Sequence, residues 1–174
     1  MDRLSHRSAA PGDLVLHPVF VVGLGVLVLN DHVLKGRMPG VVTGKLSDAA
    51  GLAIFPVLLV ALLEVGRWLG RRPEWRATAR GFVVAAAVTV ALFTAIKVPG
   101  PFGDIYRTTI GWSQWALSAA PRLIAGRPLG SPHRAELMVD TSDLLALPMA
   151  LVAVWVGSSV RRETLDSTRS ITGD

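Results

Sequence analysis

Ionisable side chains gather in two stretches of the sequence, each at the edge of a long apolar run. We predict that nine of them contribute to a binding site: Asp31, His32, Lys35, Lys45, Asp48, Lys97, Arg134, Asp140 and Asp143. Side chains of these types are expensive to place beside hydrocarbon and usually serve a function there. Arginine outnumbers lysine fifteen to three, yet all three lysines belong to this set. Together with two predicted helix N-termini, they favour an anionic ligand such as a lipid phosphate or pyrophosphate.

Simpler explanations compete at these positions. Ser47 and Asp48, like residues 141–143, stand at predicted helix starts, where their side chains would cap free backbone amides. The lysines could instead extend to lipid headgroups. The carboxylates and His32 could also gather into an oxygen-rich metal or proton site, but their spacing defines no set of metal ligands.

No motif in the sequence names a reaction. The absence of cysteine excludes disulfides, thiolate nucleophiles and cysteine metal sites. The sequence also lacks a phosphate-binding glycine loop, a serine-nucleophile elbow and a two-histidine zinc motif. Catalytic residues, cofactors and enzymatic activity therefore stay open.

Four apolar runs determine the expected fold class. Hydrophobic residues make up 51% of the 174 residues, and the mean hydropathy is +0.46. A soluble bundle would need a polar stripe along each helix, whereas the third run offers only Thr89 and Thr94 before Lys97. We expect an all-α polytopic membrane protein, because each run is long enough to cross a hydrocarbon core of roughly 30 Å. The four predicted transmembrane helices cover residues 14–34, 49–69, 81–98 and 144–160.

The distribution of arginine predicts the orientation of these helices. Five arginines lie within residues 67–80, the short second loop, and such loops are the ones that the positive-inside rule counts. We therefore expect a cytoplasmic N-terminal segment at residues 1–13, a transmembrane domain at residues 14–160, and a disordered cytoplasmic tail at residues 161–174. The nine site residues then face the non-cytoplasmic side. Topology also accounts for the net charge of +5 without a nucleic-acid partner.

The long third loop contains an amphipathic segment. Apolar or small side chains recur with helical spacing between Ile105 and Leu123, while arginine, glutamine and serine occupy the other faces. This pattern predicts an interfacial helix with Trp112 and Trp115 at headgroup depth. Pro121 should end or kink it.

Two segments of the sequence resemble each other. Residues 48–61, DAAGLAIFPVLLVA, align without a gap with residues 140–153, DTSDLLALPMALVA, which pairs Asp48 with Asp140 and Pro56 with Pro148. One interpretation is a parallel repeat in which helices one and two match helices three and four. The other is chance similarity in a chain rich in leucine, valine and alanine.

The segment HRAELMVDTSDLLALPMALVAVWVG resembles the last part of VanZ-like membrane proteins, and GKLSDAAGLAIFP is similar to the start of their second helix. The match covers Arg134, Asp140, Asp143 and Leu144, and more loosely Lys45, Asp48 and Pro56. The chain departs from that family by lacking Asn-x-x-Gly in the last helix and a glutamate and glutamine after the third. NDHVLK, TGKLSD and DLLALP resemble more closely a group of bacterial four-helix membrane proteins without an established activity. The resemblance implies a bacterial inner-membrane protein with a role in the cell envelope.

Two functions follow as hypotheses. In the first, the site binds an anionic envelope lipid or its headgroup, with Asp48, Asp140 and Asp143 positioning Lys45 and Arg134. In the second, the four helices form half of a dimeric proton- or cation-coupled transporter or channel, with Asp31, His32 and Asp48 as the ion site. A transporter needs a polar path, and the helix centres offer little besides Thr89. A homo-oligomer could still provide such a path.

Overall fold

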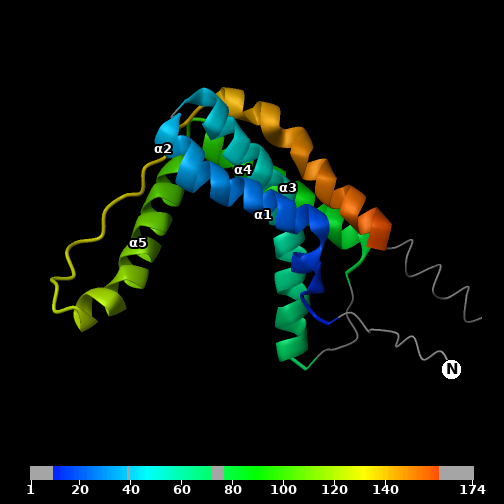
Figure 1. Ribbon diagram of the computed structural model, residues 1–174, viewed down its shortest axis with the longest axis horizontal. Coiled ribbons are helices and arrows are strands. Elements are labelled where there is room, and N and C mark those ends of the chain that lie inside the picture. The colour runs from blue at the N-terminus through cyan, green and yellow to red at the C-terminus, as the bar shows by residue number, and fades with distance from the viewer. Residues whose placement is uncertain (1–9, 39, 72–76, 161–174) are drawn as a thin grey trace, which may run out of the picture. The chain divides into compact units, whose positions relative to one another are not determined.

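The computed structural model describes residues 10–38, 40–71 and 77–160, and every regular element in these ranges is helical (Figure 1). In chain order the elements are η1 (Asp13–Leu16), α1 (Pro18–Leu29), η2 (Asn30–Leu34), α2 (Lys35–Arg37), α3 (Val41–Leu69), α4 (Ala79–Lys97), α5 (Pro101–Ile124) and η3 (Thr141–Ala150). Of these, η1 and η3 are 3-10 helices and η2 is a π-helical turn, and η3 continues as an α-helix to residue 160. The prediction of an all-α chain is confirmed.

Four stretches of helix are long and apolar enough to cross a membrane, as predicted. They are Pro18–Arg37, Val41–Leu69, Ala79–Lys97 and Thr141–Val160. The protein is therefore a multi-pass membrane protein with four candidate spans. Residues 1–9 of the predicted cytoplasmic N-terminal segment and residues 161–174 of the predicted cytoplasmic tail lie outside the described residues. The orientation of the spans in the membrane stays a prediction.

The second span begins earlier than the apolar run suggests, which makes the predicted capping role of Ser47 and Asp48 wrong. Helix α3 starts at Val41, with Gly40 as its N-cap, so Ser47 and Asp48 lie inside it. Thr43 closes the start of the helix, because its hydroxyl accepts from Gly40 N at 3.2 Å and donates to Gly40 O at 2.9 Å. A threonine close to the N-cap can satisfy a free backbone amide, which is the role that was predicted for Ser47 and Asp48.

The first span also differs from its predicted bounds. Its α-helix begins only at Pro18, after His17, whose ring nitrogen accepts from Val19 N at 3.2 Å. At its other end the helix passes through the π-turn η2 and ends at Arg37, three residues beyond the predicted end at residue 34.

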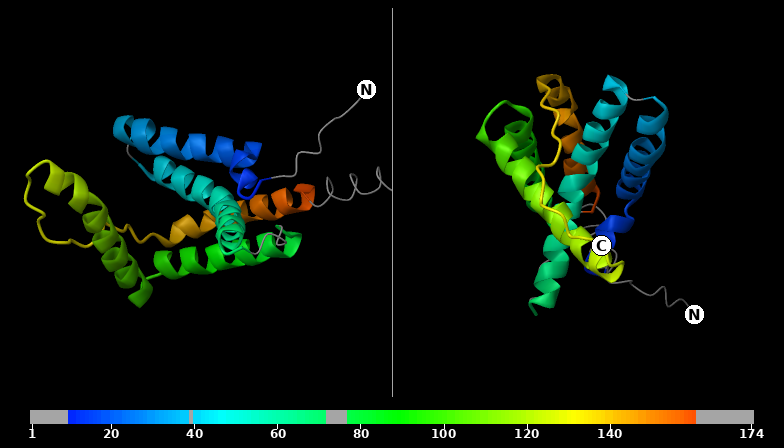
Figure 2. Two further views of the ribbon diagram at one scale, coloured as in Figure 1. Left: turned by 90° about the horizontal axis from the view of Figure 1, so that it is seen from below. Right: turned by 90° about the vertical axis from the view of Figure 1, so that its left-hand side faces the viewer.

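Contacts divide the chain into two compact units, Met1–Val90 with Leu145–Asp174, and Ala91–Leu144. The first unit has an apolar core in which Phe20 of α1, Val57 and Val60 of α3, Phe82 of α4 and Val156 of the last helix are buried. Helix α1 packs along α3 (Figures 1 and 2).

Two glycines allow the helices of the first unit to approach closely. A Cβ at Gly23 would collide with the Ile54 side chain, and one at Gly157 would collide with the Phe82 ring. Small residues at helix contacts are typical of membrane proteins, because they let the backbones come near. Gly23 therefore lies at a close helix contact, whereas Gly25 has open space beside it.

Both prolines of the aligned segments lie inside helices, Pro56 in α3 and Pro148 in η3. Helix α3 changes direction about half-way along its length (Figures 1 and 2). Proline removes one backbone hydrogen bond and crowds the preceding turn, which explains a bend near Pro56. The aligned aspartates occupy different positions, because Asp48 is inside α3 while Asp140 precedes the first turn of η3.

The second unit contains the predicted amphipathic helix, α5, and a non-helical segment that runs back beside it. This return strip, residues 127–139, bonds to α5 through Ala135 N, which donates to Arg107 O at 2.9 Å. A Cβ at Gly111 would overlap the His133 carbonyl, so only glycine fits where strip and helix touch. Pro121 does not end α5, since the helix continues to Ile124 and stops before Gly126, which has a φ of +64°. The other alternative, a kink at Pro121, stays a prediction.

Candidate functional site

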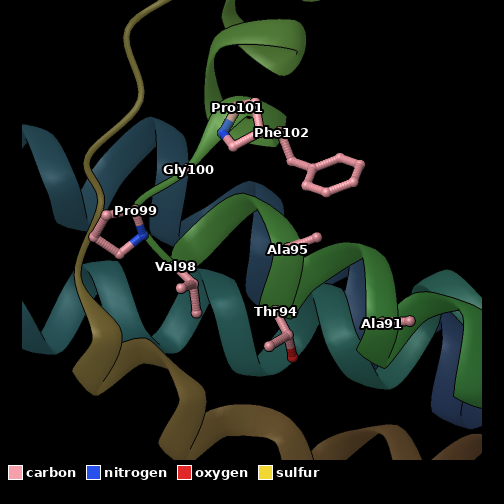
Figure 3. A pocket seen from close by; sticks show the side chains of 8 residues that line it. All are labelled: Ala91, Thr94, Ala95, Val98, Pro99, Gly100, Pro101 and Phe102. Carbon is pink, nitrogen blue, oxygen red and sulfur yellow. The ribbon is translucent and has the colours of Figure 1, made fainter.

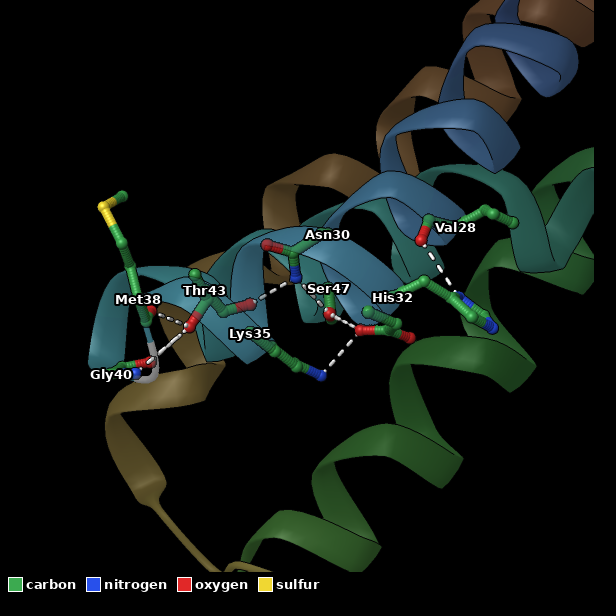
Figure 4. A network of polar contacts seen from close by, with 9 residues as sticks. Val28, Asn30, His32, Lys35, Met38, Gly40, Thr43 and Ser47 are labelled. Carbon is green, nitrogen blue, oxygen red and sulfur yellow. Dashed lines mark hydrogen bonds and ion pairs between the residues drawn. The ribbon is translucent and has the colours of Figure 1, made fainter.

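A chain of polar contacts links the first span to α3 (Figure 4). The buried Asn30 Nδ2 donates to Thr43 O and to Ser47 Oγ, each at 2.6 Å. The Ser47 hydroxyl in turn donates to Asp31 Oδ1 at 2.6 Å, and Lys35 Nζ lies 2.7 Å from the same oxygen. A fully buried amide is thereby connected to an ion pair whose side chains are about 40% exposed, 42% for Lys35 and 39% for Asp31.

The π-turn η2 begins this arrangement, with Lys35 N donating to Asn30 O across one extra residue. The wider turn lets the consecutive residues Asn30 and Asp31 both hydrogen-bond to α3, and such turns often occur at functional positions. Asn30 Oδ1 is buried without a hydrogen-bond partner among the atoms that the structure describes. Buried polar atoms of this kind are rare, because an unmade hydrogen bond costs free energy.

The other predicted residues of this region lie on the π-turn η2 and on α3. His32 is exposed and points back along its own helix, where Nδ1 donates to Val28 O at 3.1 Å (Figure 4). Lys45 and Asp48 lie in the second and third turns of α3 and are half-buried. The structure therefore joins Asp31 and Lys35 in one ion pair and directs His32 toward its own helix.

In the second unit, the last residue of α4 pairs with the start of η3. Lys97 Nζ lies 2.6 Å from Asp143 Oδ2, and the two side chains are only 13% and 10% exposed. The same ammonium lies 5.5 Å from the centre of the Phe93 ring, within the range of a cation–π contact. Lys97 and Asp143, which lie 46 residues apart in the sequence, thus form one mostly buried ion pair.

Asp140 acts as a helix cap. Its Oδ1 accepts from Ser142 N at 2.8 Å, and its backbone oxygen accepts from Asp143 N at 3.0 Å. This confirms that the fourth span has a capped start, although the capping side chain is Asp140 rather than residues 141–143.

Arg134 lies on the return strip and meets residues that were not selected from the sequence. Arg134 Nη1 and Arg107 Nη1 lie 3.7 and 3.6 Å from the same oxygen of Asp104, on the first turn of α5. Arg107 Nη2 also donates to Leu137 O at 3.0 Å. The i, i+3 spacing of Asp104 and Arg107 was the available signal, whereas the buried Asn30 could be recognised only from its surroundings.

The two faces of α5 have different neighbours. Its small and polar face is covered by the return strip, where Trp115 Nε1 donates to Gly130 O at 3.0 Å and Arg122 Nη1 donates to Leu129 O at 3.2 Å. Trp112 is 56% exposed on the opposite, apolar face and meets Trp115 edge to face. Of the two tryptophans that we expected at headgroup depth, only Trp112 therefore belongs to the exposed apolar face.

Among the described residues, no group of three His, Asp or Glu side chains is arranged to hold a metal ion. Comparisons with protein-family profiles, with curated proteins and with solved structures gave no match. The resemblance to VanZ-like proteins, and the idea that the two groups of site residues share one pocket, stay predictions.

Proposed function

We propose that this membrane protein binds an anionic lipid headgroup on the side of its first and third loops, which we predict to be non-cytoplasmic. The observation that carries the proposal is the structure of the α5 hairpin, by which we mean α5 together with the return strip. It combines a broad exposed apolar face with several arginines. This combination suits a module that lies in the interface of a bilayer.

The apolar face of α5 supports contact with lipid. Its large side chains are each more than half exposed: Phe102, Ile105, Trp112, Leu117, Leu123 and Ile124. A row of this size on a water-facing surface would be an aggregation hazard, whereas at a bilayer surface it is buried among acyl chains. The return strip occupies the opposite face and supplies partners for the polar groups there.

The charges of the α5 hairpin support an anionic ligand. The hairpin, residues 101–139, contains four arginines, one aspartate and one glutamate, which leaves a net charge of +2. Asp104 is shared by Arg107 and Arg134 at 3.6 and 3.7 Å, so one carboxylate faces two guanidinium groups. A guanidinium presents paired donors that match the oxygens of a phosphate, and this pair is the phosphate-binding candidate.

The lysine pairs have a different role in this proposal. Lys35 is matched with Asp31, and the mostly buried Lys97 is matched with Asp143. Each pair holds a cation near the end of a candidate span without a large net charge. We therefore assign attraction of the headgroup to the arginines and positioning of the span ends to the lysine pairs.

Transport receives less support than lipid binding. Within the described ranges, Thr89 is the buried polar side chain nearest the middle of a span, and its hydroxyl donates to Ala85 O of the same helix at 2.8 Å. This contact satisfies the hydroxyl inside α4 and does not continue into a polar path.

The proposal is tested with the full-length protein in nanodiscs, by titrating phosphatidylglycerol or undecaprenyl phosphate against phosphatidylcholine. A basic residue near an anionic surface contributes about 1 kcal/mol, so Arg107→Gln with Arg134→Gln should weaken anionic lipid binding about thirtyfold. Arg80→Gln, at the start of α4, is the matched control and should change little. The proposal fails if the double variant keeps its preference for anionic lipid, and the transport hypothesis gains if ion flux in liposomes changes instead.

A further inference from the structure

We propose that the elbow between α4 and α5 holds a hydrocarbon chain of a membrane lipid. A groove of about 490 Å³ is lined by eight residues between positions 91 and 102, among them Ala91, Ala95 and Phe102 (Figure 3). It is an open groove on the surface and not an enclosed cavity. The inference deepens the proposed function, because it names the apolar part of the lipid, and it rests on that function only for the ligand being a lipid.

The elbow has a fixed geometry. Helix α4 ends at Lys97 and α5 begins at Pro101, so three non-helical residues change the direction of the chain. Pro99 and Pro101 restrict this turn, since each proline ring fixes φ. Gly103 packs the first turn of α5 closely, because a Cβ there would lie 3.4 Å from Leu137 Cδ2 and 3.8 Å from Ile96 O. Because this turn is short and has a proline on each side of Gly100, it limits the movement of α4 and α5 toward each other, and the groove between them stays open.

The lining of the groove is almost entirely apolar. Thr94 provides its one hydroxyl-bearing side chain, and the remaining seven residues are alanine, valine, proline, glycine or phenylalanine. The Phe102 ring is 58% exposed and lies on the side of the elbow toward which the Ala95 side chain points (Figure 3). Such a surface offers dispersion contacts and very few hydrogen-bond partners, so it suits hydrocarbon and not a polar solute.

The position of the groove also identifies its occupant. Ala91 to Lys97 form the last part of a candidate span, so hydrocarbon surrounds this helix up to its charged end. The groove follows α4 for only about 10 Å, seven residues at a rise of about 1.5 Å each. A single acyl or isoprenoid chain can lie along it, with its headgroup toward the end of α4 where Lys97 is held by Asp143.

The experiment measures the lipid that full-length protein retains after transfer from phosphatidylglycerol vesicles into detergent, by mass spectrometry of the purified protein. Ala95→Trp and Ala91→Trp place a large side chain in the groove. Retained lipid should fall about tenfold, which corresponds to excluding about two methylene groups. Ala87→Trp is the matched control, because Ala87 is exposed one turn earlier on the same row of α4 and does not line the groove. If Ala95→Trp fails to fold, Ala95→Leu and Ala91→Trp remain informative.

The outcomes separate the groove from the headgroup site. Equal retention in all variants, an equal loss with Ala87→Trp, or a change in oligomeric state without a loss of lipid would overturn the groove. Phosphatidylglycerol with six-carbon chains should be retained less than the long-chain form, and equal retention would contradict chain binding. If Arg107→Gln with Arg134→Gln abolishes the preference for anionic lipid while the tryptophan variants have no effect, the proposed function stands and this inference fails. If only the tryptophan variants lose lipid, the groove stands and headgroup recognition by the arginines fails.

Discussion

Replacing Asn30 with leucine distinguishes a purely structural amide from one that binds a further partner. Asn30 is fully buried, donates two hydrogen bonds through Nδ2, and leaves Oδ1 without a partner within the described part of the chain. Leucine has a similar size and no polar atoms. It therefore removes the two hydrogen bonds and the unsatisfied carbonyl together.

The expected change in the free energy of unfolding is small, because the two effects oppose each other. Losing two hydrogen bonds at about 1 kcal/mol each costs about 2 kcal/mol, and removing a buried unsatisfied carbonyl returns about 1–3 kcal/mol. Asn30→Leu should therefore stay within about 1 kcal/mol of the natural protein. Asn30→Asp should cost about 3–5 kcal/mol, since it places an unmatched carboxylate in a dry site beside a backbone carbonyl.

The measurement is unfolding of the full-length protein in mixed micelles by titration with a denaturing detergent, followed by far-ultraviolet circular dichroism. We expect Asn30→Leu to resemble the natural protein, Asn30→Ala to be weaker because it also leaves a cavity, and Asn30→Asp to be the weakest. A loss of about 3 kcal/mol or more in Asn30→Leu would refute the reasoning, because it would mean that Oδ1 makes a hydrogen bond. A tolerated Asn30→Asp would equally refute it, by showing that the site is wet.

Three further predictions concern other contacts of the described residues. Lys97→Met and Asp143→Asn should each lower the free energy of unfolding by about 3–5 kcal/mol, and the double variant should lose less than their sum; additive losses in denaturant titrations would contradict a coupled pair. Gly111→Ala should lower the free energy of unfolding by about 1–3 kcal/mol, because its Cβ overlaps a carbonyl of the return strip. Gly25→Ala, which has open space, should instead stabilise α1 by up to about 1 kcal/mol. An equal change in the melting temperature of both variants would argue against this packing. Glu64→Ala should lower the melting temperature more than Glu64→Gln, because the carboxylate accepts from two backbone amides and glutamine keeps one acceptor oxygen. Equal losses would mean that the charge, which both variants remove, matters more than these contacts.

The number of spans was predictable because hydrophobic length is a property of the sequence alone. Each of the four apolar runs corresponds to a candidate span in the structure. The helix ends were less predictable, since polar residues at an end can cap the helix or extend it. Helix α3 begins at Val41, after Gly40, seven residues before Asp48, and the first span continues through the π-turn to Arg37, beyond its predicted end at residue 34. The hydropathy of these polar residues does not distinguish the two outcomes.

The partners of the site residues depended on tertiary contacts. Sequence patterns selected Lys97 and Asp143 as functional candidates, but their pairing across 46 residues follows from the packing of α4 against the start of η3. Arg134 finds Asp104 because the return strip runs back along α5, and no periodicity predicts the path of a non-helical strip. Asn30 became notable only when its burial and its unpaired oxygen were known.

The sequence by itself determined an all-α membrane protein, its four candidate spans and its amphipathic third loop, because these features follow from hydrophobic length and periodicity. Only the tertiary structure decided which ions pair, which face of α5 is covered, and where the chain leaves an apolar groove. Those properties depend on distances between residues that are far apart in the chain. The type of a residue, whether a carboxylate, an arginine or a glycine, does not specify which neighbour it contacts in the folded protein.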